Sequence, residues 1–321
     1  MDITGIDAIR YGTTDLDDSR RYLSDVGLKE VEHGAAGCRF VTMDGGEVEV
    51  RSVTDAGLPP TTISGATIRE VVWGVVSPAT LDRIGAELEK DRKVTRDPDG
   101  TLHSHDATGF GIGFRVTRVK PLSRDAEPPV NLPGAEPLRI DRRIEFPDYV
   151  CVRHIGHAVF YVPDYRAARD FYLNRLGFRL SDAFIGAGAF MRCQRNPQHH
   201  SIFMLQGDPQ RAPRMAAHHV AFEVGDFHEV IVGGNALMKK GWKSEFGPGR
   251  HIIGSNYFWY FRTPCGSASE YYADIDYLTE AWKPREWDFT PEVVYGWMLS
   301  AAEPKEAARG SSAAFTAAKL S

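Results

Sequence analysis

Four stretches of the chain share one pattern of apolar and polar positions, in which a buried strand leads through a turn into a helix. The clearest copy is the apolar run 154–162, followed by a Pro-Asp turn and by residues 166–176, whose apolar positions recur at helical spacing. Gly177 then occupies the place of a helix C-cap. The same order occurs near the N-terminus, with a strand at 6–11 and a helix at 19–26. The pattern therefore predicts a strand–helix unit that the chain repeats.

A second pair of segments extends this repeat. Residues 217–226 predict a strand and 227–240 a helix, and their earlier counterparts are 68–77 and 79–90. Short strands follow each helix, which predicts four βαβββ units, at about 5–55, 66–120, 152–207 and 216–278. A single unit has exposed strand edges and is not stable alone. We therefore expect the units to pair as two curved sheets, each enclosing a hollow where a ligand could bind.

Composition along the chain divides it into four regions. Residues 1–120 and 151–280 would form the two domains, and 121–150, rich in Pro, Arg and acidic residues, would link them. Residues 281–321 would be a C-terminal extension. Its Ala-, Ser- and Lys-rich end is expected to be a short helix or disordered.

The overall composition is that of a globular protein and excludes several classes. The 321 residues are 42% hydrophobic and carry a net charge of −5 without a basic tract, so nucleic acid is not expected as a partner. No apolar run approaches the roughly 20 residues that span a membrane, and the N-terminus lacks the pattern of a secretion signal. The four cysteines are scattered and indicate no disulfide framework. We therefore expect a cytoplasmic protein with no membrane partner.

Three residues could form a metal site. His157 and His219 hold equivalent positions in the first strands of the third and fourth units, and Glu270 lies in a late strand of the fourth. Two neutral imidazoles and one carboxylate can bind one face of a divalent metal and leave the other face open, as is typical of non-haem Fe(II) or Mn(II). The three residues are too far apart in the sequence for a helix-local motif, so the fold would have to assemble them.

The first half of the chain lacks these ligands. Aligning the repeats places Ala8, Val71 and Gly113 opposite the two histidines and the glutamate. The scaffold itself therefore does not require polar residues at these positions, which favours a function for the triad over a structural role.

The motifs around the triad resemble those of type I extradiol ring-cleavage dioxygenases, which belong to the vicinal oxygen chelate (glyoxalase, bleomycin-resistance protein and dioxygenase) superfamily. The similar motifs are His-His-Val-Ala-Phe at 218–222, the segment 247–256, Tyr260, and Pro-Cys-Gly-Ser-Ala-Ser-Glu-Tyr at 264–271. The resemblance is specific over 152–280 and only architectural over 1–120. It implies an α+β fold with two domains, each of paired βαβββ modules. The curved, incompletely closed sheet of the second domain would surround a metal pocket, and the first domain would lack metal ligands.

The resemblance also implies an activity. This is extradiol, or meta, ring cleavage of a catechol-type aromatic diol with O₂ in aromatic compound degradation, by a homo-oligomer (a dimer or tetramer). His157, His219 and Glu270 would hold Fe(II) as the expected metal, with Mn(II) as the alternative. Competing hypotheses on the same scaffold are cleavage of a hydroquinone or trihydroxybenzene, and another metal-dependent enzyme such as an isomerase or hydrolase. A metal-free binding protein of the bleomycin-resistance kind is a third.

Further site residues follow from the resemblance. Tyr260 would hydrogen-bond a substrate oxygen, His251 would stand at the mouth of the pocket, and Arg250 would balance charge near the substrate. His199 and His200 match a strand-borne acid–base histidine, and only one of two adjacent strand residues can face the pocket. We expect His200 to be that catalyst and keep His199 in reserve.

The walls of the pocket are less specified by the sequence. Phe246 stands where some relatives that cleave catecholic acids carry a second arginine, which weakens the case for a substrate carboxylate bound there. Aromatic residues in the predicted strands are candidates for the walls: Phe184, Phe190, Phe203, Tyr257, Trp259 and Tyr272.

Overall fold

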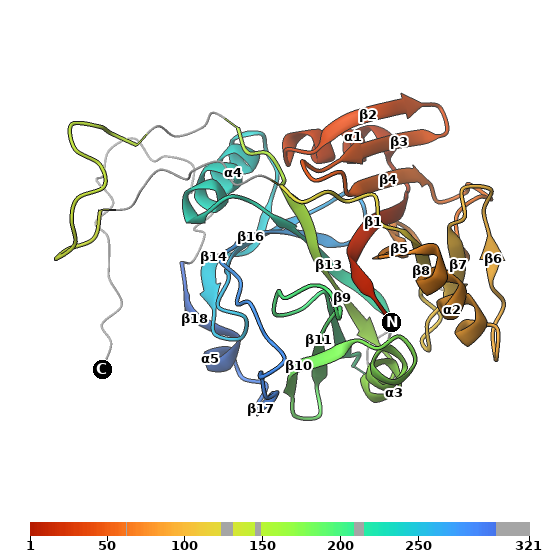
Figure 1. Cartoon of the computed structure of the whole chain (residues 1–321). Helices are drawn as coiled ribbons and strands as arrows, with labels where there is room; N and C mark the ends of the chain where they lie inside the picture. The colour runs from red at the N-terminus through yellow and green to blue at the C-terminus, as the bar shows by residue number, and fades with distance from the viewer. Residues whose placement is uncertain (62, 123–130, 145–148, 209–214, 300–321) are drawn as a thin grey trace.

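The computed structural model describes residues 1–61, 63–122, 131–144, 149–208 and 215–299, and it contains the four predicted βαβββ units (Figure 1). The first unit consists of β1 (Ile3–Thr13), α1 (Leu16–Asp25), β2 (Lys29–Gly34), β3 (Gly37–Val41) and β4 (Glu47–Ser52). The second consists of β5 (Thr67–Val75), α2 (Pro78–Leu88), β6 (Thr95–Arg96), β7 (Leu102–His105) and β8 (Gly111–Val116).

The third and fourth units repeat this order in the second half of the chain. The third consists of β9 (His154–Val162), α3 (Tyr165–Asp170), the π-helical turn η1 (Phe171–Arg175), β10 (Arg179–Phe184), β11 (Gly188–Arg192) and β12 (Ile202–Gln206). The fourth consists of β13 (Ala216–Glu223), α4 (Phe227–Lys239), β14 (Ser244–His251), β15 (Tyr257–Arg262) and β16 (Ala268–Ala273). The predicted helix at 166–176 is therefore divided between α3 and η1.

A side-chain cap begins the main helix of every unit. Asp15, Ser77, Asp164 and Asp226 precede these helices, and each side chain accepts a hydrogen bond from a backbone N–H of the first turn. Gly177 follows the third helical segment with φ of +73°, a left-handed conformation that glycine adopts without steric cost. The repeat in the sequence is thus a repeat of local turn chemistry.

The C-terminal extension joins the second sheet. It contains β17 (Arg285–Trp287), α5 (Pro291–Val294) and β18 (Tyr295–Met298). β17 pairs with β10 and β18 pairs with β14, so the extension covers both free edges of the sheet that the third and fourth units form. This segment is therefore part of the second sheet and not a separate appendage. Residues 300–321, where a helix or disorder is predicted, lie outside the described residues.

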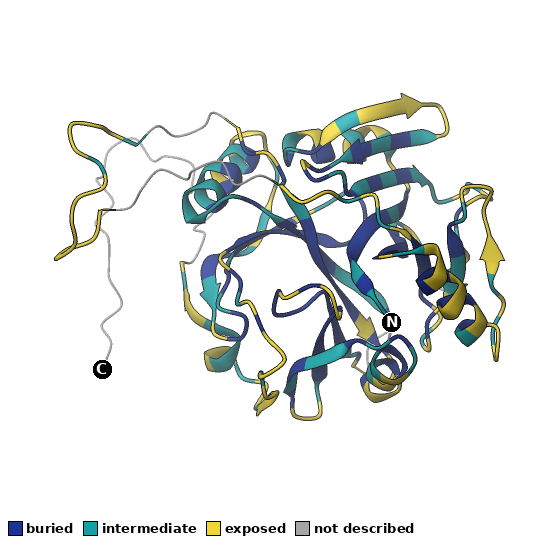
Figure 2. Ribbon diagram, viewed as in Figure 1, coloured by how far each residue is buried: buried dark blue, intermediate teal, exposed yellow. Residues whose placement is uncertain are grey.

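Each half of the chain forms one curved sheet with the first strands of its two units at the centre. The strand orders are β2-β3-β4-β1-β5-β8-β7-β6 and β17-β10-β11-β12-β9-β13-β16-β15-β14-β18, and neither sheet closes on itself. The central pairs β1–β5 and β9–β13 are antiparallel, which relates the two units of each sheet by an approximate twofold axis. Figure 2 shows that the central strands are buried, whereas β2 and β6 at the ends of the first sheet are exposed.

The two sheets share one hydrophobic core. Trp73 of β5 packs edge-on against Phe178, with 5.0 Å between ring centroids. The Tyr271 hydroxyl of β16 donates to the Val26 carbonyl oxygen at 2.7 Å, and buried apolar residues of both halves form one continuous cluster. The second sheet therefore packs against the first through this shared core. Among the described residues, no helix has the length and apolar character that a bilayer crossing requires.

Candidate metal centre and its pocket

Three neighbouring strands bring the predicted metal ligands together. In the pairing of β9, β13 and β16, Ala221 lies opposite His157 on one side and opposite Glu270 on the other. His219 is two residues from Ala221 on β13 and therefore points to the same face of the sheet. The three side chains thus converge around Ala221, whose own side chain is a single methyl group.

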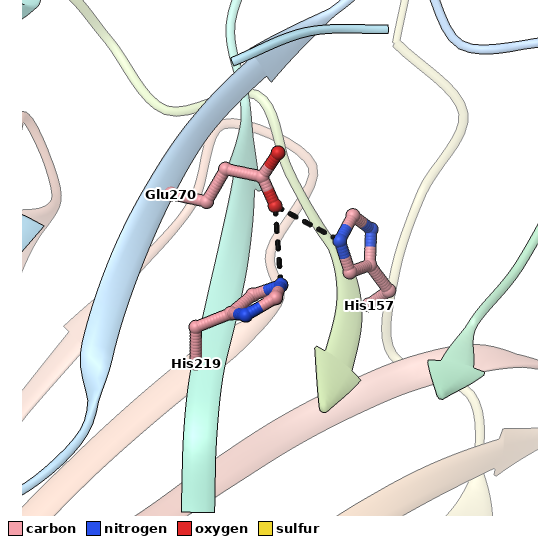
Figure 3. Close-up of side chains that lie close together, drawn as sticks. All are labelled: His157, His219 and Glu270. Atoms are coloured by element: carbon pink, nitrogen blue, oxygen red, sulfur yellow. Dashed lines mark hydrogen bonds and ion pairs between the residues drawn. The ribbon is translucent and has the colours of Figure 1, made fainter. Parts of the chain in front are cut away.

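The triad is compact and buried. Glu270 Oε2 lies 3.0 Å from His157 Nε2 and 3.2 Å from His219 Nε2 (Figure 3). One possible ligand atom from each residue lies within 4.8 Å of the other two. Within the described residues, no other group of three or more His, Cys, Asp or Glu side chains is this close. The described part of the first sheet therefore contains no comparable candidate metal site. Asn256 donates to the second oxygen of Glu270 at 3.1 Å and fixes the direction of the carboxylate.

The charge state of the triad fits a divalent metal. Burial opposes ionisation of Glu270, but the imidazoles of His157 and His219 hold the pKa of this carboxyl well below its ordinary value. Burial lowers the pKa of His219, so this ring is neutral. Its Nε2 is buried, is not aligned for a hydrogen bond with Glu270, and has no other hydrogen-bond partner among the described residues. An ionised carboxylate beside a neutral imidazole nitrogen without a partner is the donor set that a divalent metal requires.

His199 and His200 precede β12 and do not lie on a strand, contrary to the prediction, and their ring planes stand at 84° to each other. His200 lines the cavity with its ring centroid 4.0 Å from that of His157. His199 is buried behind it, with Nδ1 3.0 Å from His200 Nδ1 and Nε2 3.4 Å from Asp182 Oδ2. The structure therefore turns His200 toward the triad and places His199 between His200 and a buried carboxylate.

Asp182 is a residue to which the sequence assigns no role. Besides its contact with His199, its carboxylate accepts hydrogen bonds from the backbone N–H of Arg285 at 2.8 Å and from Trp287 Nε1 at 3.3 Å. The C-terminal extension is thus connected to the histidine pair through one buried carboxylate. No local sequence signal identifies this contact, because its partners are distant in the chain.

Tyr260 and His251 both line the cavity, with Tyr260 Oη 3.0 Å from His251 Nε2. His251 Nδ1 lies 2.8 Å from the Val294 carbonyl oxygen, which can only accept, so this nitrogen carries a proton. Burial lowers the pKa of His251, so the ring is neutral and the Tyr260 hydroxyl donates to its bare Nε2. Burial also raises the pKa of Tyr260 well above its ordinary value, and the hydroxyl keeps its proton at neutral pH.

Arg250 does not line this cavity. Its guanidinium donates to the Ser255 carbonyl at 2.8 Å, to Tyr257 Oη at 2.6 Å and to Asp274 Oδ2 at 2.7 Å. Adjacent residues of a strand point to opposite faces, so the orientation that brings His251 to the cavity turns Arg250 away. The predicted contact between Arg250 and a substrate therefore has no support in the geometry.

A cavity of about 380 Å³ adjoins the triad. Phe184, Phe190 and Phe203 lie in its wall as predicted, whereas the other three aromatic candidates do not. Phe289 and Val294 of the C-terminal extension complete the wall. The segment that covers the edges of the sheet therefore also closes one side of the pocket.

The structure thus contains paired βαβββ units and a buried cluster of two histidines and one carboxylate, as the resemblance to vicinal oxygen chelate proteins implies. Residues 154–271 match the family model described as the Glyoxalase/Bleomycin resistance protein/Dioxygenase superfamily. Over these residues the chain is similar to that superfamily.

Two curated relatives refine the comparison. The sequence is 36% identical to metapyrocatechase 2 of Cupriavidus necator over 151 residues, which are 46% of this chain and 45% of the relative. It is 24% identical to the manganese-dependent 2,3-dihydroxybiphenyl 1,2-dioxygenase of Geobacillus genomosp. 3 over 235 residues, or 69% of this chain and 72% of the relative. The chain thus spans less than half the length of metapyrocatechase 2 in that match.

Solved structures match the fold along almost the whole chain. The Mn(II)-bound glyoxalase from Novosphingobium aromaticivorans has a TM-score of 0.73 at 23% identity and covers 92% of this chain and 91% of its own. Homoprotocatechuate 2,3-dioxygenase from Arthrobacter globiformis has a TM-score of 0.71 at 21% identity, with 92% and 88% covered. The predicted resemblance to extradiol dioxygenases and the predicted α+β fold with open, curved sheets are confirmed.

Proposed function

We propose that this chain is a metal-dependent extradiol dioxygenase, which opens the ring of a catechol-type diol beside its vicinal hydroxyl groups with O₂. The observation that carries the proposal is the convergence of His157, His219 and Glu270 in a cavity whose wall also contains His200 and Tyr260. Relatives named as a metapyrocatechase and as a 2,3-dihydroxybiphenyl 1,2-dioxygenase support the same type of reaction.

His157, His219 and Glu270 would hold the metal. We propose Fe(II), with Mn(II) as the alternative, because this ligand set accepts both ions and two similar proteins are named for manganese. Once bound, the cation would supply positive charge that lowers the pKa of the diol hydroxyls and a common site for diol and O₂.

His200 would move the proton of a diol hydroxyl. Burial and the neighbouring histidines lower the pKa of His200 well below its ordinary value, so the ring is neutral and can accept a proton. Its Nδ1 faces His199, which leaves Nε2 as the atom that takes the proton and returns it during ring opening.

Tyr260 would orient the second substrate oxygen. Its protonated hydroxyl is held by His251 Nε2 and can turn from there to donate to an oxygen of the bound diol. His251, in turn, is held by the Val294 carbonyl, so the donor is positioned before the substrate enters.

We further propose that the protein acts in the cytoplasm, as a homo-oligomer of two or four chains, in the degradation of aromatic compounds. All four cysteines are unpaired and three of them are buried, which is compatible with a reducing compartment.

Anaerobic reconstitution with Fe(II) or Mn(II), followed by metal analysis and oxygen-uptake measurements, tests the proposed function. We expect one metal per chain, O₂ consumption with catechols and a yellow ring-opened product. O₂ uptake with para-diols or trihydroxybenzenes alone would identify a hydroquinone-type enzyme instead. Metal binding without O₂ uptake would indicate an isomerase or hydrolase, and a protein that binds no metal would refute every enzymatic hypothesis on this site.

A further inference from the structure

We infer that the substrate is an uncharged catechol with a bulky aromatic substituent, and that catechols with an anionic substituent are poor substrates. This inference rests on the proposed ring-cleaving function. It concerns the ring substituent of the substrate, which the triad itself does not contact.

The cavity has a polar end at the triad and an aromatic end beyond it. His200 stands between the two, since its ring centroid lies 4.0 Å from that of His157 and 5.2 Å from that of Phe190. From Phe190 the row continues to Phe184 at 5.5 Å, and Phe289 lies 4.7 Å from Phe184. A diol held at the triad would therefore direct a ring substituent on the His200 side along a row of phenylalanines.

The aromatic end presents apolar surface that is not fully covered. Phe190 and Phe203 stack with centroids 3.7 Å apart and lie in an apolar cluster separate from the main core. Phe289 lines the cavity yet keeps 56% of its surface exposed. An apolar substituent against Phe184 and Phe289 would remove this surface from water, and an aromatic one would add edge or face contacts with the rings.

The described part of the cavity lining lacks a cationic partner for a negative charge. Among the described residues, neither lysine nor arginine lines the cavity. The acidic side chains of the lining and the triad are Glu245, which is exposed, and Glu270. Arg250, next to His251 in the sequence, is bound to Asp274 outside the lining. A substrate carboxylate would therefore lose its hydration without gaining a cation, and Glu245 would repel it.

A matched series of diols on the metal-loaded enzyme tests this inference. We would measure kcat/KM by oxygen uptake for catechol, 3- and 4-phenylcatechol, 3,4-dihydroxyphenylacetate and the methyl ester of this acid. We expect the better phenylcatechol to exceed catechol, and the ester to exceed the acid, by about tenfold or more. Equal values for acid and ester, or no gain from the phenyl group, would overturn the inference. Turnover of catechol in the same assay would show that the proposed ring cleavage still holds.

Substitutions in the wall locate the effect. Phe184→Ala and, at a more exposed position, Phe289→Ala should each lower the phenylcatechol-to-catechol ratio several-fold, by about three- to tenfold. The control Ile185→Ala changes an exposed neighbour of Phe184 that lies outside the lining, and it should keep the wild-type ratio. Glu245→Gln should narrow the acid-to-ester difference, most of all at low ionic strength. If both phenylalanine variants kept the phenylcatechol-to-catechol ratio of the control, the aromatic end would not be the site that binds the phenyl substituent.

Discussion

Replacing Gly156 by alanine should damage both the stability of the protein and its metal site. Gly156 precedes His157 on β9, and a Cβ atom built there would lie within 3.0 Å of three atoms of the Tyr272 side chain, including Oη. Tyr272 is fully buried, and its hydroxyl donates to Gln198 Oε1 at 2.9 Å. The added methyl group therefore fits only if the ring moves and this hydrogen bond breaks.

Two energetic costs follow from this displacement. Forcing a methyl group into a packed core costs about 1–3 kcal/mol. Leaving a buried hydrogen-bonding group without its partner costs about 1–3 kcal/mol more. We therefore expect the free energy of unfolding to fall by about 2–6 kcal/mol, a large share of the roughly 5–15 kcal/mol of a typical protein. Because the Tyr272 ring lies 5.2 Å from that of His157, metal affinity should fall as well.

Urea unfolding and competition with a chromogenic chelator measure the two effects. Gly34→Ala is the matched control, because a Cβ atom at this strand glycine meets nothing within 4 Å and its φ is not in the left-handed region. We expect the control to stay within about 0.5 kcal/mol of the wild type. A Gly156→Ala protein with the wild-type unfolding midpoint and the wild-type metal affinity would refute the reasoning.

Three further predictions concern the proton, the metal and the pH dependence of stability. His200→Gln should keep the metal but lower kcat about 10²–10⁴-fold, because it removes the acid–base group. Metal analysis together with oxygen-uptake measurements tests both parts, and a loss of metal would contradict the assignment of His200 as the acid–base group. Asn256→Ala should weaken metal binding about 10–100-fold in a chelator titration, since Glu270 loses the donor that orients it, and unchanged affinity would speak against that role. Burial opposes protonation of His154, but Asp44 Oδ2 at 2.5 Å from its Nδ1 raises the pKa of His154, and the same contact lowers the pKa of Asp44 despite burial. This ion pair should therefore stabilise the fold fully between pH 3.8 and pH 6.5, the ordinary pKa values of an aspartate and a histidine. The stabilisation should be lost as the pH rises through the raised pKa of His154. It should also be lost as the pH falls through the lowered pKa of Asp44. Urea unfolding as a function of pH measures this, and a His154→Gln variant that retains the dependence above pH 6.5 would exclude the pair as its cause.

The order of helices and strands was predictable because each unit carries its own local signals. Capping residues such as Asp15 and Asp164 recur at the same place in successive units, and they act on backbone groups only a few residues away. The convergence of the two histidines of the triad was predictable for a related reason: the repeat aligns His157 with His219, and the pseudo-twofold arrangement of the central strands then brings equivalent positions together.

The tertiary structure alone decided what each side chain of the pocket faces. Alternation along a strand predicts opposite directions for Arg250 and His251, but not which of them points inward. A break in register between Ala217 and His219 even lets two adjacent histidines, His218 and His219, line the same cavity. The contact of Asp182 with the C-terminal extension likewise joins segments about 100 residues apart. Caps, turns and the order of elements are encoded within a few residues of the chain. The direction of each side chain, the strand register and the long-range contacts are set only when distant strands pair and exclude water together.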